Sequence, residues 1–131
     1  MSGKKLRLAY SDYWGNLMKE EITKDVVLAY NVPATQRVKI AELCPLTGKI
    51  ASVAMSFFDG CNGLVHVAFG HGDKWVAPAE LNTFISLNNV TPVFPTSEPV
   101  VKNEPLWAEI RNGDTNPHLI SVIATVIGRA S

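Results

Sequence analysis

The sequence lacks an excess of charge of either sign. Lysine and arginine together number 12, aspartate and glutamate together also number 12, and charged residues make up only 18% of the 131 residues. Proteins that bind nucleic acid or anionic membranes usually carry a basic patch or a positive net charge. We therefore expect no nucleic-acid and no membrane partner. A chain with so little electrostatic repulsion is also expected to associate readily with other subunits.

Long apolar segments are missing as well. The first residues, MSGKKLRLAYSDYWGN, contain no apolar stretch of signal-peptide length. The run LISVIATVIG at 119–128 is far shorter than the roughly 20 residues that a membrane-spanning helix needs. The protein is expected to be soluble, made in the cytoplasm and not secreted by a standard route. The two cysteines, Cys44 and Cys61, belong to no C-x-x-C motif, so we expect two buried free thiols.

No catalytic signature is found. The sequence has no G-x-S-x-G elbow and no glycine-rich loop ahead of a helix. The grouping closest to a metal site is His66, His71 and Asp73 in HVAFGHGD, but a glycine ends the run before His71. The remaining histidine, His118, follows a proline. We expect ordinary strand-end and loop histidines here, with no metal, no cofactor and no enzymatic activity.

The sequence does contain an alternation of apolar and polar residues with a period of two, which is typical of half-buried β-strands. The alternation occurs in RVKIAEL, KIASVAMSFF, LVHVAF, LWAEIR and LISVIATVIG. In the last of these, Leu119, Ile123 and Ile127 make the second face partly apolar too. Turn residues separate the runs, and the link CPLTGK is short enough for a hairpin. We predict an all-β fold: a single antiparallel β-sandwich or jelly-roll-like domain over residues 21–131, preceded by an N-terminal arm of residues 1–20.

Four prolines interrupt residues 87–105, which read LNNVTPVFPTSEPVVKNEP. Proline removes a backbone donor and fixes φ, so this segment is predicted to be an edge or a long crossing loop and not a central strand. Its large apolar side chains are then expected to lie off the core and to contact a partner protein: Val93, Phe94 and Val100.

Aromatic residues gather in two places, and each has two interpretations. Tyr10, Tyr13 and Trp14 in the arm either contact a neighbouring subunit or pack on the sheet of their own chain. Trp75 and Trp107 either cap the two ends of the sandwich core or form, with Tyr13, a stacking platform for sugars.

The stretch VVLAYNVPATQRVKIAEL places a Val-Pro-Ala step between two strands, and RVKIAELCPLTGKIASVAMSFF continues it through a Thr-Gly turn. Together with AEIRNGDTNPHLISVIATVIG near the C-terminus, this pattern resembles small β-sandwich virion accessory proteins of tailed bacteriophages. The resemblance implies that the proline fixes a corner at which the chain crosses between sheets. It also implies a location in the virion, the major capsid protein or another virion protein as partner, and no catalytic residues.

We therefore expect a structural virion protein, and specifically a capsid decoration or cement subunit that stabilises a phage head by bridging capsid proteins. The alternatives are a phage neck or tail component and a carbohydrate-binding β-sandwich module. A homo-oligomer is expected, with a trimer favoured. The residues expected to contact partners are Tyr10, Tyr13, Trp14, Val93, Phe94 and Val100.

Overall fold

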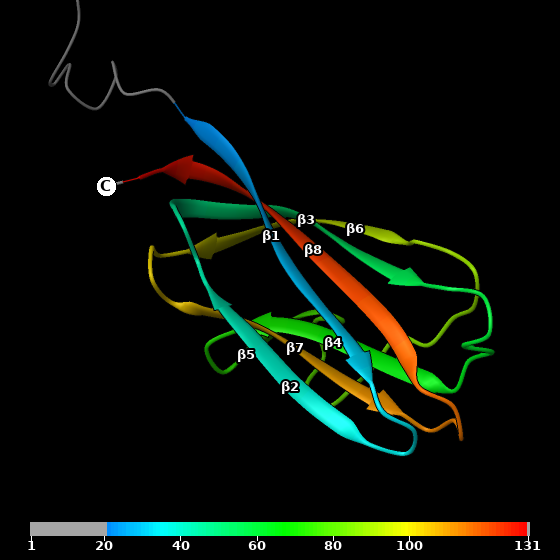
Figure 1. Cartoon of the computed structure of the whole chain (residues 1–131). Helices are drawn as coiled ribbons and strands as arrows, with labels where there is room; N and C mark the ends of the chain where they lie inside the picture. Colours follow the sequence, from blue (N-terminus) through cyan, green and yellow to red (C-terminus); the bar gives the residue numbers. More distant parts are fainter. Residues whose placement is uncertain (1–20, 131) are drawn as a thin grey trace, which may run out of the picture.

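Eight β-strands and the turns between them make up residues 21–130, the part of the chain that this computed structural model describes (Figure 1). No helix occurs among these residues, and the all-β prediction is confirmed. The predicted arm, residues 1–20, lies outside the described residues. In chain order the strands are β1 (Ile22–Val32), β2 (Arg37–Leu43), β3 (Thr47–Phe57), β4 (Val65–His71), β5 (Lys74–Ala77), β6 (Val93–Val100), β7 (Pro105–Asn112) and β8 (His118–Arg129).

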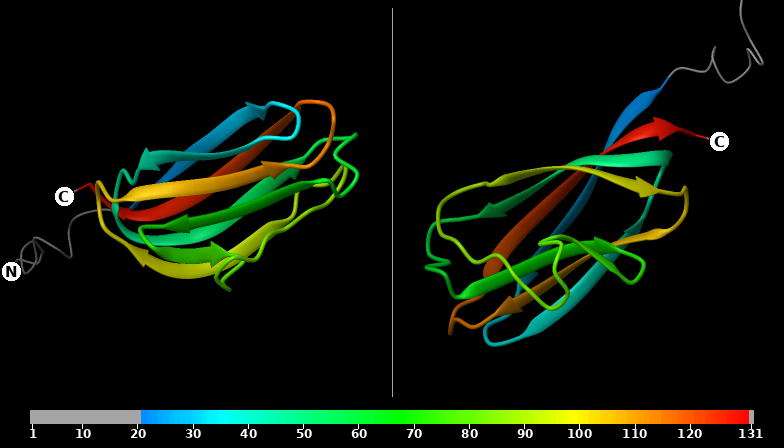
Figure 2. Two further views of the ribbon diagram at one scale, coloured as in Figure 1. Left: turned by 90° about the horizontal axis from the view of Figure 1, so that it is seen from below. Right: turned by 180° about the vertical axis from the view of Figure 1, so that it is seen from behind.

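The strands form two antiparallel sheets that pack face to face (Figure 2). The first sheet has the order β1-β8-β3-β6, and the second sheet has the order β2-β7-β4-β5. The chain changes sheet at every connection except the β4–β5 hairpin. Neighbouring segments of the chain thus alternate between two packed sheets, and the sandwich prediction is confirmed.

The two connections singled out in the sequence behave differently. The Val-Pro-Ala corner is confirmed, since Pro33 leaves β1 in the first sheet and Arg37 begins β2 in the second. The predicted hairpin through CPLTGK is wrong, because β2 and β3 belong to different sheets. Cys44 and Leu46 in this link are fully buried. The link therefore crosses the margin of the core with its apolar side chains directed inward.

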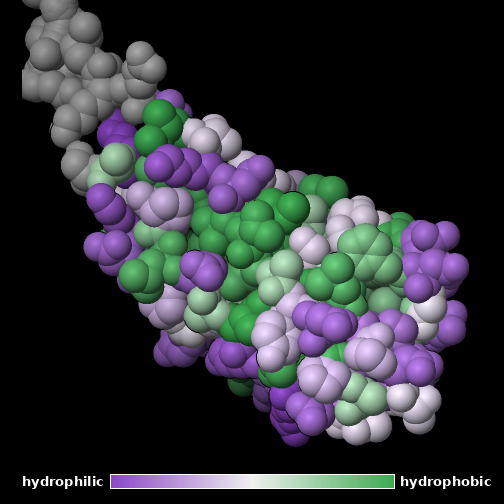
Figure 3. Space-filling view, viewed as in Figure 1, coloured by the Kyte–Doolittle hydropathy of each residue, from purple (hydrophilic) through white to green (hydrophobic). Residues whose placement is uncertain are grey.

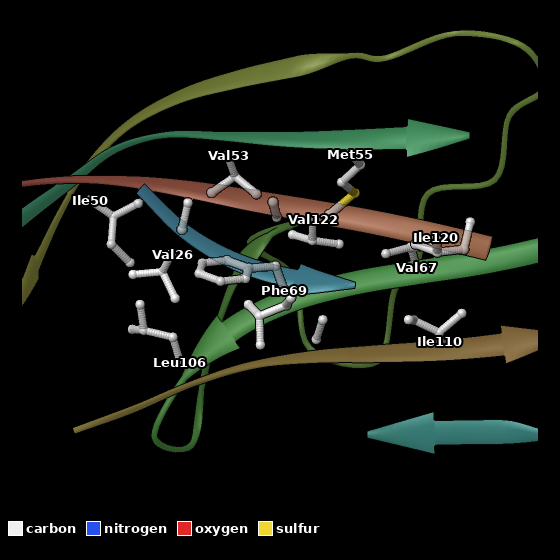
Figure 4. Packing of buried hydrophobic residues seen from close by; sticks show 14 of the residues in the cluster. Val26, Ile50, Val53, Met55, Val67, Phe69, Leu106, Ile110, Ile120 and Val122 are labelled. Atoms are coloured by element: carbon white, nitrogen blue, oxygen red, sulfur yellow. The ribbon is translucent and has the colours of Figure 1, made fainter. Parts of the chain in front are cut away.

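Apolar side chains from both sheets meet between them and form one core (Figure 4). The alternation in β3 places Val53, Met55 and Phe57 inward, as predicted. Phe69 of β4 is fully buried between the sheets. Burial of such surface contributes about 25 cal/mol per Å² and is the main favourable contribution to folding. The inward-facing side chains of each strand are thus buried in the core, and only the outward-facing side chains can contact another molecule.

The proline-rich segment forms an edge strand, β6, and it also contributes to the core. β6 is outermost in the first sheet, and its Pro95 and Pro99 are exposed. Val100, however, is only 3% exposed, and Phe94 packs against the core. The prediction that Val100 lies off the core is wrong, because β6 alternates like an ordinary strand and turns one side inward.

Candidate functional site

The structure separates the six residues that were predicted to contact a partner. Three lie outside the described residues: Tyr10, Tyr13 and Trp14. Val100 is in the core, and Phe94 faces the core from β6. Val93 is 59% exposed on the outer face of the first sheet. Of the described part of the set, Val93 is therefore the residue that remains accessible to a partner.

The outer face of the first sheet has an uncharged, largely apolar part that crosses all four of its strands. The strand register aligns Val27 of β1, Ile123 of β8, Ala54 of β3 and Val93 of β6 in one row. A second row consists of Ala29, Ser121 and Ser56. None of these residues is charged. We call them, together with Leu119, the apolar face: Val27, Ala29, Ala54, Ser56, Val93, Leu119, Ser121 and Ile123.

Much of the apolar face is open to solvent. Val27 is 53% exposed and Leu119 is 48% exposed, and Figure 3 shows hydrophobic side chains gathered over β1 and β8. Asp25 and Lys49 lie toward the end at which β1 begins, where Asp25 Oδ1 accepts a hydrogen bond from Thr125 Oγ1 at 2.8 Å. Contiguous apolar surface of this kind commonly marks a contact with another protein.

Sequence reasoning named one residue of the apolar face, Val93. A signal for two more was visible, since the partly apolar second side of LISVIATVIG contains Leu119 and Ile123. Their neighbours Val27 and Ala54 could not be joined to them, because the order of strands in the sheet does not follow from the alternation.

The outer face of the second sheet has a different character, with aromatic and basic side chains. Trp75 of β5 packs edge to face against Trp107 of β7, with ring centroids 5.1 Å apart, and against Phe84 at 5.4 Å. Lys39 Nζ lies 4.5 Å from the centroid of the Trp107 ring, and the Arg111 guanidinium carbon lies 4.3 Å from that of Phe84. The cations cover the ring faces, so this surface remains polar toward solvent.

The contact between Trp75 and Trp107 shows that the two rings do not cap opposite ends of the core. Trp107 is 4% exposed, and its Nε1 donates a hydrogen bond to the Gly72 carbonyl at 2.8 Å. Its ring also lies so close to Gly70 that a Cβ there would collide with it. Trp107 therefore has a structural role, and the partly exposed rings of this cluster are those of Trp75 and Phe84.

A histidine between two glutamates connects the sheets at the margin where β5 and β6 lie. His71 approaches Glu98 of β6 through Nε2 at 2.7 Å and Glu104 of the β6–β7 turn through Nδ1 at 2.8 Å. Lys74 adds a 3.0 Å ion pair with Glu98. Burial lowers the pKa of His71, but hydrogen bonds to Glu104 and Glu98 outweigh it, so the pKa lies above its ordinary value. Burial opposes a low pKa at Glu98, but His71 and Lys74 hold that pKa below its ordinary value.

This arrangement is an ion-pair cluster and not a metal-binding geometry. A metal ion needs its donors to converge on one point, whereas the two carboxylates bind different ring nitrogens of His71. Among residues 21–130, no group of three His, Cys, Asp or Glu side chains is placed to hold a metal ion. His66 is exposed on the outer face of the second sheet, and His118 pairs with Asp114 at 2.7 Å.

Cys44 and Cys61 are buried free thiols, as predicted. Burial raises the pKa of both thiols. Cys44 Sγ also donates a hydrogen bond to the Leu46 carbonyl at 3.1 Å. Buried thiols with a raised pKa are poor nucleophiles, so the two side chains contribute to packing.

Comparison with known proteins identifies no family and no function for this chain. No protein-family model matches this chain, and no curated protein matches its sequence. Among solved structures, the crystal structure of FlhE is similar with a TM-score of 0.41 and 12% sequence identity, over 81% of this chain and 96% of that chain. A likeness at this level carries no functional conclusion. No helix within residues 21–130 is long and apolar enough to cross a membrane.

Proposed function

We propose that this protein is a structural virion protein of a tailed bacteriophage, a capsid decoration or cement subunit that docks on capsid proteins through the apolar face. The observation that supports docking is the contrast between the two outer faces of the sandwich. In the first sheet the outward-facing charges Asp25 and Lys49 lie toward the end at which β1 begins, whereas Lys39, Glu109 and Arg111 lie across the second sheet. The phage head as the setting is taken from the sequence resemblance.

Docking would remove Val27, Leu119 and Ile123 from water against a neighbouring protein. A standard interface buries about 1,600 Å² in total, and side chains held on strands need no loop to become ordered on binding. A subunit that finds its contact only on the mature, expanded shell shifts the equilibrium toward that shell. This is how a protein without catalytic groups would stabilise a phage head.

Two other functions remain as alternatives with less support. A neck or tail component would use the same kind of apolar surface, and copy number distinguishes it from a decoration subunit. A carbohydrate-binding module is disfavoured because Trp107 lies buried beneath Lys39. Trp75 and Phe84 meet with an interplanar angle of 88°, so they do not form a flat platform on which a sugar ring could stack.

Quantitative mass spectrometry of phage particles purified from the source of this sequence tests the proposal. A decoration or cement subunit is expected in a copy number comparable to that of the major capsid protein. A copy number far below that of the capsid protein indicates a neck or tail component. Absence from the particles, combined with binding of the purified protein to a glycan array, contradicts the virion proposal and supports the carbohydrate-binding module.

A further inference from the structure

Within the described part of the chain, the two sheets have four edge strands, and three of them are protected against pairing with another chain. β6 carries Pro95 and Pro99, and β5 has only four residues. β2 carries charged, exposed side chains at Arg37, Lys39 and Glu42. Prolines, short length and charge are the devices by which proteins prevent edge-to-edge association.

Among the edges that the structure describes, β1 lacks these devices over most of its length. It runs for 11 residues without proline, and it pairs with β8 in an unbroken register from Ile22 to Val32. Its segment from Val26 to Val32 contains no charged residue. The other side of β1 pairs with no strand among residues 21–130, and Figures 1 and 2 show β1 (blue) at the margin of the first sheet. Its outward backbone groups are therefore a template for one more strand.

β1 is complementary to an antiparallel copy of itself. In the register centred on Val27, all 11 residues are paired, and inward-facing residues oppose inward-facing residues. Lys24 then opposes Tyr30, which is 44% exposed, and Asp25 opposes Ala29. A register centred on Lys24 or Asp25 would place that charged residue against itself, which is unfavourable.

We propose that two copies of this chain associate through β1, with the strands antiparallel about a twofold axis at Val27. The two four-stranded first sheets then become one continuous sheet across the axis. The two apolar faces also become one surface, because Val27 and Ala29 lie at the shared margin. The inference concerns the isolated protein and does not depend on the proposed virion role.

This dimer replaces the trimer that the sequence suggested. A closed ring built from edges of the first sheet needs two different edges to meet, which here means β1 of one copy and β6 of the next. Pro95 and Pro99 remove backbone donors from β6. The first sheet therefore favours a twofold contact, in which both copies use the same edge.

The mass of the full chain in solution, measured by sedimentation equilibrium, is the first test. The expected mass of the wild-type species is twice the chain mass of 14.3 kDa. Val27→Lys is expected to reduce it to the single-chain mass, because two like charges would face each other at the axis. Val93→Lys is the matched control, since Val93 is similarly exposed but lies on the proline-bearing edge strand; its dimer is expected to persist.

Cysteine substitution tests the register. Val27→Cys is expected to form an intermolecular disulfide under mild oxidation, because equivalent side chains would face each other across adjacent strands. Ala29→Cys lies on the same face of β1 but is not expected to cross-link, because its two copies would be about 13 Å apart along the strands. Cys44 and Cys61 do not interfere, because both are fully buried.

A single-chain mass for the wild-type protein overturns the inference. It is also overturned by a dimer that survives Val27→Lys, or by cross-linking of Ala29→Cys as readily as Val27→Cys, because either result places the contact elsewhere. Loss of the dimer in Val27→Lys with an unchanged far-ultraviolet circular dichroism spectrum supports it. Since no phage particle takes part, failure of the virion proposal would leave these measurements unaffected.

Discussion

Asn112, at the end of β7, is the one polar residue buried among residues 21–130. Its Nδ2 donates hydrogen bonds to the carbonyls of Val32 at 3.1 Å and Asn116 at 2.9 Å, and its Oδ1 accepts one from the Asp114 amide at 2.9 Å. The side chain thereby fixes the end of β1 to the β7–β8 turn. Sequence reasoning identified only a turn here, because Val32 is 80 residues away along the chain.

Replacing Asn112 by alanine is expected to lower the free energy of unfolding by about 2–3 kcal/mol, because buried carbonyl and amide groups lose their partners. Urea denaturation measures this change. Asn116→Ala is the matched control: its side chain is exposed, and it contributes its backbone carbonyl. A change within about 0.5 kcal/mol is expected there. Equal losses in the two variants would show that Asn112 does not fix the turn.

His71 makes stability depend on pH. Although burial lowers its pKa, Glu104 and Glu98 raise the pKa above the ordinary value of 6.5. A raised folded-state pKa gives stabilisation that is full below the unfolded-state pKa and is lost as pH rises through the folded-state value. The lowered pKa of Glu98 matters at acidic pH. The stabilisation that the Glu98 carboxylate contributes is lost as the pH falls through that lowered value.

His71→Gln is therefore expected to reduce stability strongly at about pH 5.5 and much less at about pH 9. Thermal unfolding of the wild type and the variant across this range measures the difference. His66→Gln serves as the control, because His66 is exposed on the outer face of the second sheet. A deficit in His71→Gln that stays constant with pH would mean that the protonated ring does not hold the two carboxylates.

At the scale of single elements, β6 shows what a pattern of residues can predict. The prolines correctly indicated an edge strand, because an edge needs no donors on its outer side. The same prolines interrupted the visible alternation, so the inward turn of Phe94 and Val100 was missed. The hairpin prediction for CPLTGK was wrong because a hairpin and a link that crosses between sheets can have the same length. The burial of Cys44 and Leu46, which is seen only in the structure, distinguishes the two.

Val100→Ala is expected to lower the free energy of unfolding by about 1–3 kcal/mol, because it leaves a cavity in the core. Val93→Ala, in the same strand, is expected to change it by no more than about 0.5 kcal/mol, because Val93 is exposed. Chemical denaturation of both variants provides the measurement. A larger loss in Val93→Ala than in Val100→Ala would reverse the inward and outward sides assigned to β6.

At the scale of the whole molecule, the fold could be predicted and the surface could not. Alternation is a local property of each run, so the sandwich followed from it. The apolar face combines Val27, Ala54 and Ser121, which are distant in sequence and meet only through the order β1-β8-β3-β6. For the same reason, the sequence did not predict that Trp75, Phe84 and Trp107 form a cluster on the second sheet.

The central claim is that the apolar face is the docking surface, and binding to phage heads that lack this protein tests it most directly. Ser121→Lys places a charge at the centre of the apolar face, and Ala41→Lys places the same charge on the exposed outer face of the second sheet. We predict equal affinity for the wild type and Ala41→Lys, and binding weaker by about tenfold or more for Ser121→Lys, because a lysine would be desolvated without a partner. Equal binding of all three proteins, or a loss confined to Ala41→Lys, would contradict this account.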